Sequence, residues 1–502
     1  MRYEFLAPQK AWEELCTHRN RYYRRYIAAY NGDRAELSAT SENGLFWSRA
    51  GKAKVHVPVA ADIATTSSDL LFSEEPTFTC YDEQTEDKGS KQQKRLDTLI
   101  SLNAINRKLS EGAETCAALG DVYLKLNWFP ERVDYPVLSV VQGDSAWAEY
   151  FMGELQGVHF FSVLRIDSGT GVYLRLYERY EKGYIYSGIF RGDQSNLGLE
   201  LPETELAKLG LARETKAPIN ELLAAHIPNV KPNRRHRDSE MGRSDFDELR
   251  PLMDSLDEAY SSWMRDIRLA KARLIVPAEY LRRKASDMFK DGQYTYEFDE
   301  DIETLVALDI DPERGANTIT PSQFAIRSEE HAATCSDIIR NIITIAGYSP
   351  QTFGLEISGA AQSGTALNIR RQKSYSTRGK KENYWKPATE RILTSMIHLD
   401  AALFPNEGSE MDDEVKMRFA AVEGNDISTM SSALQMLNSA AAVSTEMKVQ
   451  MLHPDWTQKQ VDEEIRRVKA ENGLNIDNPD AGLGDLERAD RTPIAEEYDS
   501  PN

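Results

Sequence analysis

Five carboxylates lie close together past the middle of the chain, at Glu297, Asp299, Glu300, Asp301 and Glu303. Carboxylate oxygens are the ligands that Mg²⁺ and Ca²⁺ prefer, and bound divalent ions support nuclease chemistry. The alternative is an acidic surface in contact with solvent. We favour the acidic surface, because no other catalytic group lies nearby in the sequence.

A second candidate is the pair His331 and Cys335, four residues apart on a predicted helix. This spacing places both side chains on one face, which is half of a zinc site. Because no second pair accompanies it, we favour packing on a helix face and expect no metal and no cofactor. The sequence also lacks the motifs GxxxxGK[ST], GxGxxG, GxSxG and HExxH, which disfavours the common nucleotide-hydrolysing and acyl-transfer enzymes.

A third candidate is a basic stretch in a chain whose formal net charge is −20. Its members are Arg370, Arg371, Lys373, Arg378, Lys380, Lys381, Lys386 and Arg391. Two interpretations remain open, namely contact with phosphate and pairing with an acidic neighbouring subunit. Tyr384 and Trp385 are expected to pack against the protein rather than to stack on bases.

The N-terminal segment mixes arginines with Tyr22, Tyr23 and Tyr26. Arginine and aromatic faces can contact nucleic acid. We favour instead a surface helix that packs on its own domain through these tyrosines.

Composition excludes several classes of protein. The chain has 502 residues and 41% hydrophobic content, enough for several domains with real cores. Its first residues lack the apolar stretch of a signal peptide, and no apolar run approaches the ~18 residues of a membrane span. Four cysteines without a CxxC pair fit reduced thiols in a cytosol. The charge of −20 repels phosphate on average, which argues against an ordinary DNA-binding domain but suits a conduit through which DNA slides.

The clearest structural signal in the sequence is a series of apolar residues that recur with heptad spacing, which we call the heptad stripe. Its members are Phe246, Leu249, Met253, Leu256, Tyr260, Trp263, Ile267, Ala270 and Leu274. This period predicts a helix over 244–274 that buries one seam, with Pro251 in its first turns and Ser244 or Asp245 as the N-cap. Such a helix is a strut of roughly 45 Å.

A second helix is predicted over 322–346, with Cys335, Ile338, Ile342 and Ile345 on one face. The insert 275–321 between the two helices is predicted to contain a short helix, AEYLRRKA, and the stretch YTYEFDED. After Tyr348, glycines at 354, 359 and 364 suit a mobile loop. A long helix follows over 365–403, broken or kinked near Gly379 and Pro387.

The remaining segments alternate between helix and strand signals. Strand, helix and strand are predicted over 55–80, and one amphipathic helix over 94–118. Five strands are predicted over 120–195, and the last four, at 136–141, 157–166, 171–180 and 182–191, are predicted to form a β meander. Residues 198–242 are rich in loop signals. A short strand over 414–420 and helices over 427–472 precede an acidic tail for which we predict disorder.

Five segments in this order resemble the portal proteins of tailed bacteriophages, the head-to-tail connector family. They are VHVPVAADIATTSSDLLFSEEPTF, AALGDVYLKLNW, DELRPLMDSLDEAYSSWMRDIRLAKARLIVP, AGYSPQTFGLEISGAAQSGTAL and MLHPDWTQKQVDEEIRRVKAENG. Together they span most of residues 50–475. None is a catalytic signature, so the resemblance depends on their order and spacing.

The resemblance implies an α+β, elongated subunit that assembles as a ring, likened to the family's wing, stem, clip and crown. The implied parts are an N-terminal helical segment 1–44, wing 45–242, stem helix 243–275, clip 276–321, stem helix 322–347, tunnel loop 348–366, kinked wing helix 367–404, second wing part 405–427, crown 428–472 and tail 473–502. The N-terminal segment and the tail match no part of the family that we recognise.

The resemblance also implies a function without catalysis. It implies a twelve-membered ring at the unique capsid vertex of a virion made in the bacterial cytoplasm, through which double-stranded DNA is packaged and ejected. Implied partners are the terminase large subunit, a head–tail adaptor, and the major capsid and scaffolding proteins, with no membrane. Implied channel residues of the tunnel loop are Gly354, Ser358, Gly359, Ala360, Gln362, Ser363 and Gly364. Two alternatives are a metal-dependent nuclease and a generic cytosolic helical adaptor.

Overall fold

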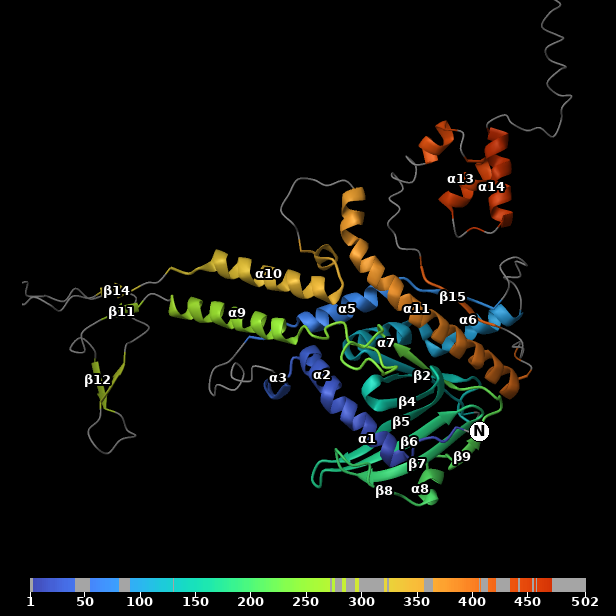
Figure 1. Cartoon of the computed structure of the whole chain (residues 1–502), viewed down its shortest axis with the longest axis horizontal. Helices are drawn as coiled ribbons and strands as arrows, with labels where there is room; N and C mark the ends of the chain where they lie inside the picture. The colour runs from blue at the N-terminus through green and yellow to red at the C-terminus, as the bar shows by residue number, and fades with distance from the viewer. Residues whose placement is uncertain are drawn as a thin grey trace, which may run out of the picture.

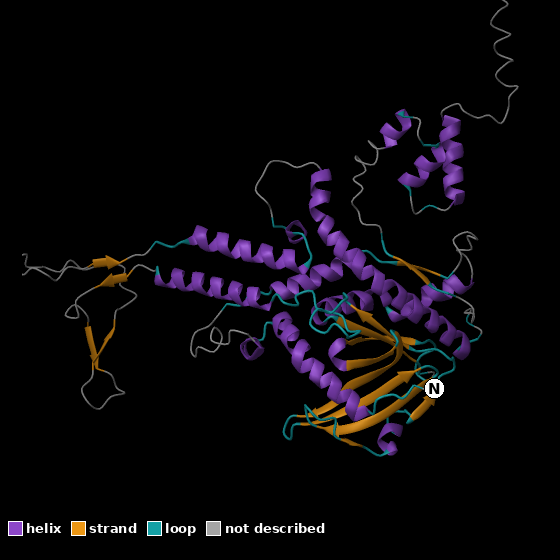
Figure 2. Ribbon diagram, viewed as in Figure 1, coloured by secondary structure: helices purple, strands orange, loops and turns teal. Residues whose placement is uncertain are grey.

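The computed structural model describes most of the chain between residues 3 and 471. The described residues are 3–40, 55–80, 91–129, 131–270, 273–275, 282–285, 294–297, 320–322, 325–355, 364–405, 407, 414–420, 434–440, 443–453, 456 and 458–471. Helices and strands are mixed along the chain, as predicted. Most strands gather in one part of the molecule, and two long helices run away from it (Figure 2).

Three of the four runs predicted as a β meander are adjacent strands of an antiparallel sheet in the order β4-β5-β6-β7-β8, with β9 also paired to β7. The prediction is wrong for the first run, PVLSVV, which belongs to a second sheet, and β4 takes its place. The strands of the six-stranded sheet are β4 (Ala146–Phe151), β5 (Glu154–Asp167), β6 (Val172–Glu181), β7 (Tyr184–Gly192), β8 (Leu199–Glu200) and β9 (Glu214–Lys216). Helix α8 (Glu203–Ala207) connects the last two strands. One face is covered by helix α1 (Pro8–His18), whose Trp12 joins Phe161, Tyr177 and Phe190 in a buried cluster.

A second, three-stranded sheet has the order β10-β2-β3. Its strands are β2 (Asp121–Asn127), β3 (Val137–Gln142) and β10 (Ala224–Pro228). Strand β10 lies where only loops were predicted, and each of its residues is buried, which explains why no alternating pattern marks it.

The helix predicted over 94–118 is two helices, α6 (Lys91–Asn103) and α7 (Ile105–Leu119). They separate at Ala104, which has a left-handed backbone with φ 48°. Helix α7 ends at Gly120, where φ is 101° and a Cβ atom would lie 2.9 Å from the carbonyl carbon of Arg243. Only glycine fits this turn into β2.

Helix α5 (Val59–Phe72) is present as predicted, whereas residues 55–58 form no strand. Strand β1 (Thr77–Thr79) pairs with β15 (Lys416–Arg418), the short strand predicted near the end of the chain. Both edges of this ribbon are occupied by helix side chains. Gln93 bonds to the Phe78 carbonyl and the Cys80 N–H, and Glu390 accepts from the Met417 N–H.

The N-terminal segment contains α1, the π-helical turn η1 (Arg19–Tyr23), α2 (Arg24–Asn31) and α3 (Arg34–Thr40). Tyr22 and Tyr23 are buried, and Tyr23 donates a hydrogen bond to Asp121 at 2.9 Å. Tyr26 donates to Asp247 at 2.9 Å. The interpretation that these tyrosines pack on the protein itself is confirmed.

The first long helix, α9, spans Arg250–Leu269 and is shorter than predicted at both ends. Phe246 and Leu249 keep the heptad spacing but precede the helix in a turn, where Glu248 has φ 66°. Pro251 lies in the first turn of α9, where its missing N–H costs nothing. Leu274 belongs to strand β11 (Arg273–Ile275), which pairs with β14 (Thr320–Ser322).

The second long helix, α10, spans Ser328–Ala346. The predicted apolar face is wrong at its last position: Ile345 is 60% exposed, and Ile343 is buried with Ile342 instead. In the insert between the helices, the prediction of a helix for AEYLRRKA (278–285) is wrong for the last four residues. These residues form β12 (Arg282–Ala285), which pairs with β13 (Tyr294–Glu297).

The long helix predicted over 365–403 is α11 (Gly364–Leu403), which continues through Gly379 and Pro387 without a break. Its first turns run in a different direction from the rest (Figure 1). Tyr384 is half-buried and Trp385 is 0% exposed, so both pack as expected.

Near the C-terminus, α13 (Thr445–Leu452) and α14 (Gln458–Glu471) pack through Val449, Val461 and Ile465. The predicted disordered tail lies outside the described residues.

Candidate functional site

Helices α9 and α10 lie side by side and antiparallel, and an ionic cluster joins their outer ends (Figure 1). Asp266 Oδ2 on α9 lies 2.9 Å from His331 Nε2 and accepts from Arg327 Nη2 at 2.9 Å. These hydrogen bonds, His331 first, lower the pKa of the Asp266 carboxyl. The His331 ring also stacks on Trp263, with centroids 6.0 Å apart and planes 9° apart.

This cluster gives His331 a structural partner, and Cys335 is buried in the apolar contact between the helices and the body. Within the described residues, no group of three or more His, Cys, Asp or Glu side chains can hold a metal ion. The acidic cluster at 297–303 is outside this description, apart from the backbone of Glu297 in β13. Among the described helices, none is long and apolar enough to cross a membrane.

Burial decreases along the heptad stripe from Phe246 to Ile267, although Ala270 at the end is 7% exposed. Phe246, Leu249, Met253 and Leu256 are at most 5% exposed, whereas Ile267 is 38% exposed. Between them, Tyr260 and Trp263 are half-buried. On α10, Ile342 is buried and Ile338 partly buried. The outer half of the helix pair therefore presents apolar side chains that the described part of the chain does not cover.

Helix α10 ends at Gly347, and a 3₁₀ turn, η4 (Pro350–Phe353), leads to Gly354. Gly354 has φ 71° and no neighbour within 4 Å of a Cβ position. The predicted loop residues Ser358, Gly359, Ala360, Gln362 and Ser363 lie outside the described residues, and Gly364 begins α11.

The segment after α10 is held against α11 by polar contacts. Thr377 donates to the Gly347 carbonyl at 2.6 Å, and Ser374 accepts from the Ser349 N–H at 2.9 Å. Lys373 donates to the Thr344 carbonyl. Residues 373, 374 and 377 lie on one helix face, so this part of α11 is fastened to the end of α10 and to Ser349, just before η4.

About two turns further along α11, Lys381 forms a buried ion pair with Asp245. Lys381 is 1% exposed, and its Nζ lies 2.5 Å from Asp245 Oδ2 and 2.5 Å from Ser67 Oγ. Tyr348 donates to the same Asp245 oxygen at 2.6 Å. Burial, followed by the Asp245 charge, raises the pKa of Tyr348 well above its usual value. The pair joins α11 to the turn before α9 and to α5.

These contacts correct the interpretation of the basic stretch. Lys381 and Arg378 are both buried, and Arg378 forms an ion pair with Glu382 at 2.7 Å and donates to the Ala420 carbonyl. Neither side chain is available to DNA or to another subunit. Lys380 is exposed, as is Lys373, while the side chains of Arg370 and Arg371 lie outside the description.

The Lys381–Asp245 pair was not anticipated, because the partners are 136 positions apart and no local pattern connects them. Another unanticipated network contains Asp121, His226 and Tyr150, with hydrogen-bond distances of 2.8 and 2.6 Å. Burial alone would raise the pKa of Asp121, but hydrogen bonds from His226 and the Gly242 N–H lower it. The Asp121 and His226 side chains are fully buried, so the network orders the core and does not offer a reaction site.

A family model described as phage portal protein, SPP1 Gp6-like, matches residues 18–476. No curated protein matches the chain in sequence.

Solved structures with similar chains come from gene transfer agent particles. A chain from the virion of a native particle is 13% identical, covers 84% of this chain and 93% of its own length, and gives a TM-score of 0.42. A chain from the neck of an empty particle, computed with C6 symmetry, is 13% identical over 79% of this chain and 90% of its own, with a TM-score of 0.44. A chain from the neck of a native particle, computed with C12 symmetry, is 13% identical, covers 84% of this chain and 93% of its own length, and gives a TM-score of 0.41.

Proposed function

Because this chain belongs to the SPP1 Gp6-like family of phage portal proteins, we propose that twelve copies form a ring at the unique vertex of a phage-type capsid. Double-stranded DNA enters and leaves the capsid through the channel of this ring. The terminase large subunit and a head–tail adaptor dock on it in turn, and the major capsid and scaffolding proteins surround it. The ring is made in the host cytoplasm and performs no catalysis, since the motor supplies the energy.

The observation that carries this proposal, besides the family, is the uncovered outer half of α9 and α10. In the pair formed by α9 and α10, Ile267 is still 38% exposed and Tyr260 and Trp263 are only half-buried. Trp263 is half-buried, and its Nε1 is buried without an acceptor among the described residues. A neighbouring copy of the same helix pair covers such a seam, and repetition around an axis closes a ring.

The parts of the chain have the following proposed roles. Residues 243–275 and 322–347 form the stem, and the insert 276–321 forms the clip on which the motor and the adaptor dock. Residues 348–366 form the tunnel loop at the narrowest part of the channel. Residues 45–242, 367–404 and 405–427 form the wing, and 428–472 form the crown.

Charge supports passage of DNA rather than its retention. Each copy carries a formal −20, so phosphate is repelled over most of the ring. Lys373 and Lys380, with Arg370 and Arg371, remain the candidates for contact with phosphate or with the next subunit.

Averaged negative-stain images of the purified chain test the proposal directly. We expect top views with a central hole and twelvefold symmetry, together with a mass of twelve copies by native mass spectrometry. A chain that remains monomeric at micromolar concentration under all assembly conditions contradicts it.

A further inference from the structure

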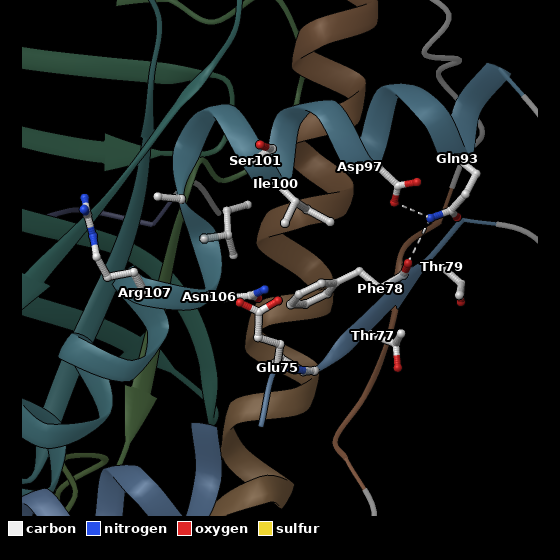
Figure 3. Close-up of a pocket in the computed structure, with 13 residues that line it drawn as sticks. Glu75, Thr77, Phe78, Thr79, Gln93, Asp97, Ile100, Ser101, Asn106 and Arg107 are labelled. Atoms are coloured by element: carbon white, nitrogen blue, oxygen red, sulfur yellow. Dashed lines mark hydrogen bonds between the residues drawn. The ribbon is translucent and has the colours of Figure 1, made fainter. Parts of the chain in front are cut away.

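A cleft of about 630 Å³ lies between β1, α6 and the first turn of α7 (Figure 3). Its volume is in the range of ligand sites, which is roughly 300–1,000 Å³. None of its residues belongs to the proposed stem, clip or tunnel loop. It is therefore a site that the portal role leaves without a function.

Two backbone groups at the edge of β1 that faces α6 already have hydrogen-bond partners without any ligand. Gln93 Nε2 donates to the Phe78 carbonyl at 3.1 Å and to Asp97 Oδ1 at 2.8 Å, and Gln93 Oε1 accepts from the Cys80 N–H at 3.0 Å. The edge of β1 that faces α6 is thus occupied by a side-chain amide. A partner cannot add a strand here, so recognition depends on a side chain that enters the cleft.

The shape of the cleft depends on the break between α6 and α7. Ala104 lines the cleft and has a left-handed backbone, φ 48°, which costs a non-glycine residue free energy. This break turns α7 away from α6. Such local strain is found more often at binding sites than elsewhere.

The cleft has an apolar floor and a polar rim. The floor is apolar, because Phe78 and Ile105 are buried and Ile100 is partly buried. The rim is rich in acceptors: Glu75 and Asp97 are exposed carboxylates, and Asn106 Oδ1 is a buried oxygen without a donor. Arg107, the cation of the lining, forms an ion pair with Glu111 on the adjacent turn at 3.6 Å.

We propose that this cleft binds a lysine or arginine side chain on an extended segment of a partner protein. Lysine and arginine combine an apolar stem with a cationic end that only donates hydrogen bonds. The stem lies along Ile100 and Phe78, and the cation reaches the carboxylate of Glu75 or that of Asp97, which lie at different ends of the cleft (Figure 3).

Fluorescence anisotropy at 150 mM salt tests this with a labelled peptide, Gly-Ala-Lys-Ala-Arg-Ala-Gly, and a matched peptide with Gln at both basic positions. We expect the basic peptide to bind the full-length protein at least tenfold more tightly. The double variant Glu75→Gln/Asp97→Asn should lower the affinity about tenfold, because it removes both charges and retains the acceptor for Gln93. Ser101→Trp, at an exposed position of the lining, should block the cleft without any change of charge.

Because the chain is acidic, a charge-matched control is essential. Glu13→Gln/Glu14→Gln removes two exposed charges from α1 and should leave the affinity unchanged. An equal loss in this control, or full binding by Ser101→Trp, would overturn the proposal. So would a loss of ring assembly in Ser101→Trp with peptide binding intact, since the cleft would then be an interface between copies. A failure to form rings in the unmodified chain bears only on the portal role, because the peptide assay does not need the ring.

Discussion

The ammonium group of Lys381 lies 2.5 Å from Asp245 Oδ2, and their side chains are 1% and 3% exposed. The carboxylate is also held by Tyr348 and by Asn229 Nδ2 at 2.8 Å. One residue of α11 thereby connects the turn before α9, the segment after α10 and Ser67 of α5. The elements on both sides of the proposed tunnel loop share a single charged anchor.

Removal of the cation from this anchor should destabilise the protein strongly. Lys381→Met keeps most of the length of the side chain but leaves a buried carboxylate without its counter-ion, at a cost of about 3–5 kcal/mol in the free energy of unfolding. Lys380→Met, at the exposed neighbouring position, should change it by less than ~0.5 kcal/mol. Chemical denaturation followed by circular dichroism measures both. Addition of Asp245→Asn to Lys381→Met should restore part of the loss, and equal stability of the two single variants would refute this role.

A charge in the uncovered helix seam should prevent assembly. Trp263→Asp places a carboxylate where we propose that another copy packs, and burial of an unpaired charge is unfavourable. We expect rings to disappear in mass photometry while the circular dichroism spectrum changes little. Ser262→Asp adds the same charge at the adjacent exposed position and should still form rings. If both variants assemble equally well, the seam is not an interface.

The loop before α11 should affect DNA transport but not assembly. Gly359→Pro or Ala360→Trp restricts or enlarges a loop that we propose to follow the moving DNA. We expect normal rings by negative stain and a clear drop in the fraction of filled capsids in a packaging assay. Ala207→Trp, an equally large change at an exposed position of α8, provides the control. Packaging at the normal level in both loop variants would show that the loop does not line the channel.

Acid should weaken the packing of the N-terminal helices. His18 is buried against Tyr22, Tyr23 and Trp147, and burial lowers its pKa from 6.5 to about 4. The unfolded chain therefore binds the proton more readily, so the contribution of neutral His18 is complete above pH ~6.5 and falls by about 3 kcal/mol as the pH decreases to about 4.

The change His18→Phe keeps an aromatic ring and should flatten the pH dependence of unfolding between pH 6.5 and 4. The exposed His236→Gln should leave most of that dependence in place. Urea unfolding at several pH values separates the two. A slope in His18→Phe equal to that of the unmodified protein would contradict the assignment.

Patterns of burial predicted more of the fold than local propensities did. Most strands of the meander and the two long helices α9 and α10 follow from periodicity. The start of α9 could not be predicted in this way. Phe246 and Leu249 continue the spacing of buried residues through a turn, and periodicity indicates which residues are buried rather than their backbone conformation. The segment ending in RRKA has helix-forming residues, yet pairing with β13 overrides this preference.

The sequence predicted which helices and loop make up the candidate site, but not the contacts between their side chains. The basic stretch was visible in the sequence, but its division into buried and exposed members depends on Asp245, Glu382 and Ala420. Asp245 and Ala420 lie outside the stretch, and a charge run contains no information about them. Only Glu382, four residues after Arg378 on the same helix, was a local partner. The cleft beside β1 was equally invisible, since it forms where residues 75–79 meet residues 93–107.

The pairing of β1 with β15 has a consequence for the timing of biosynthesis. Thr79 is opposite Lys416, so the first strand waits for its partner until most of the polypeptide has left the ribosome. At ~5–20 residues per second this delay is roughly 20–70 s. Truncated products lack the ribbon, and a nascent chain completes this part of its body only near the end of translation, when it is ready to join other copies.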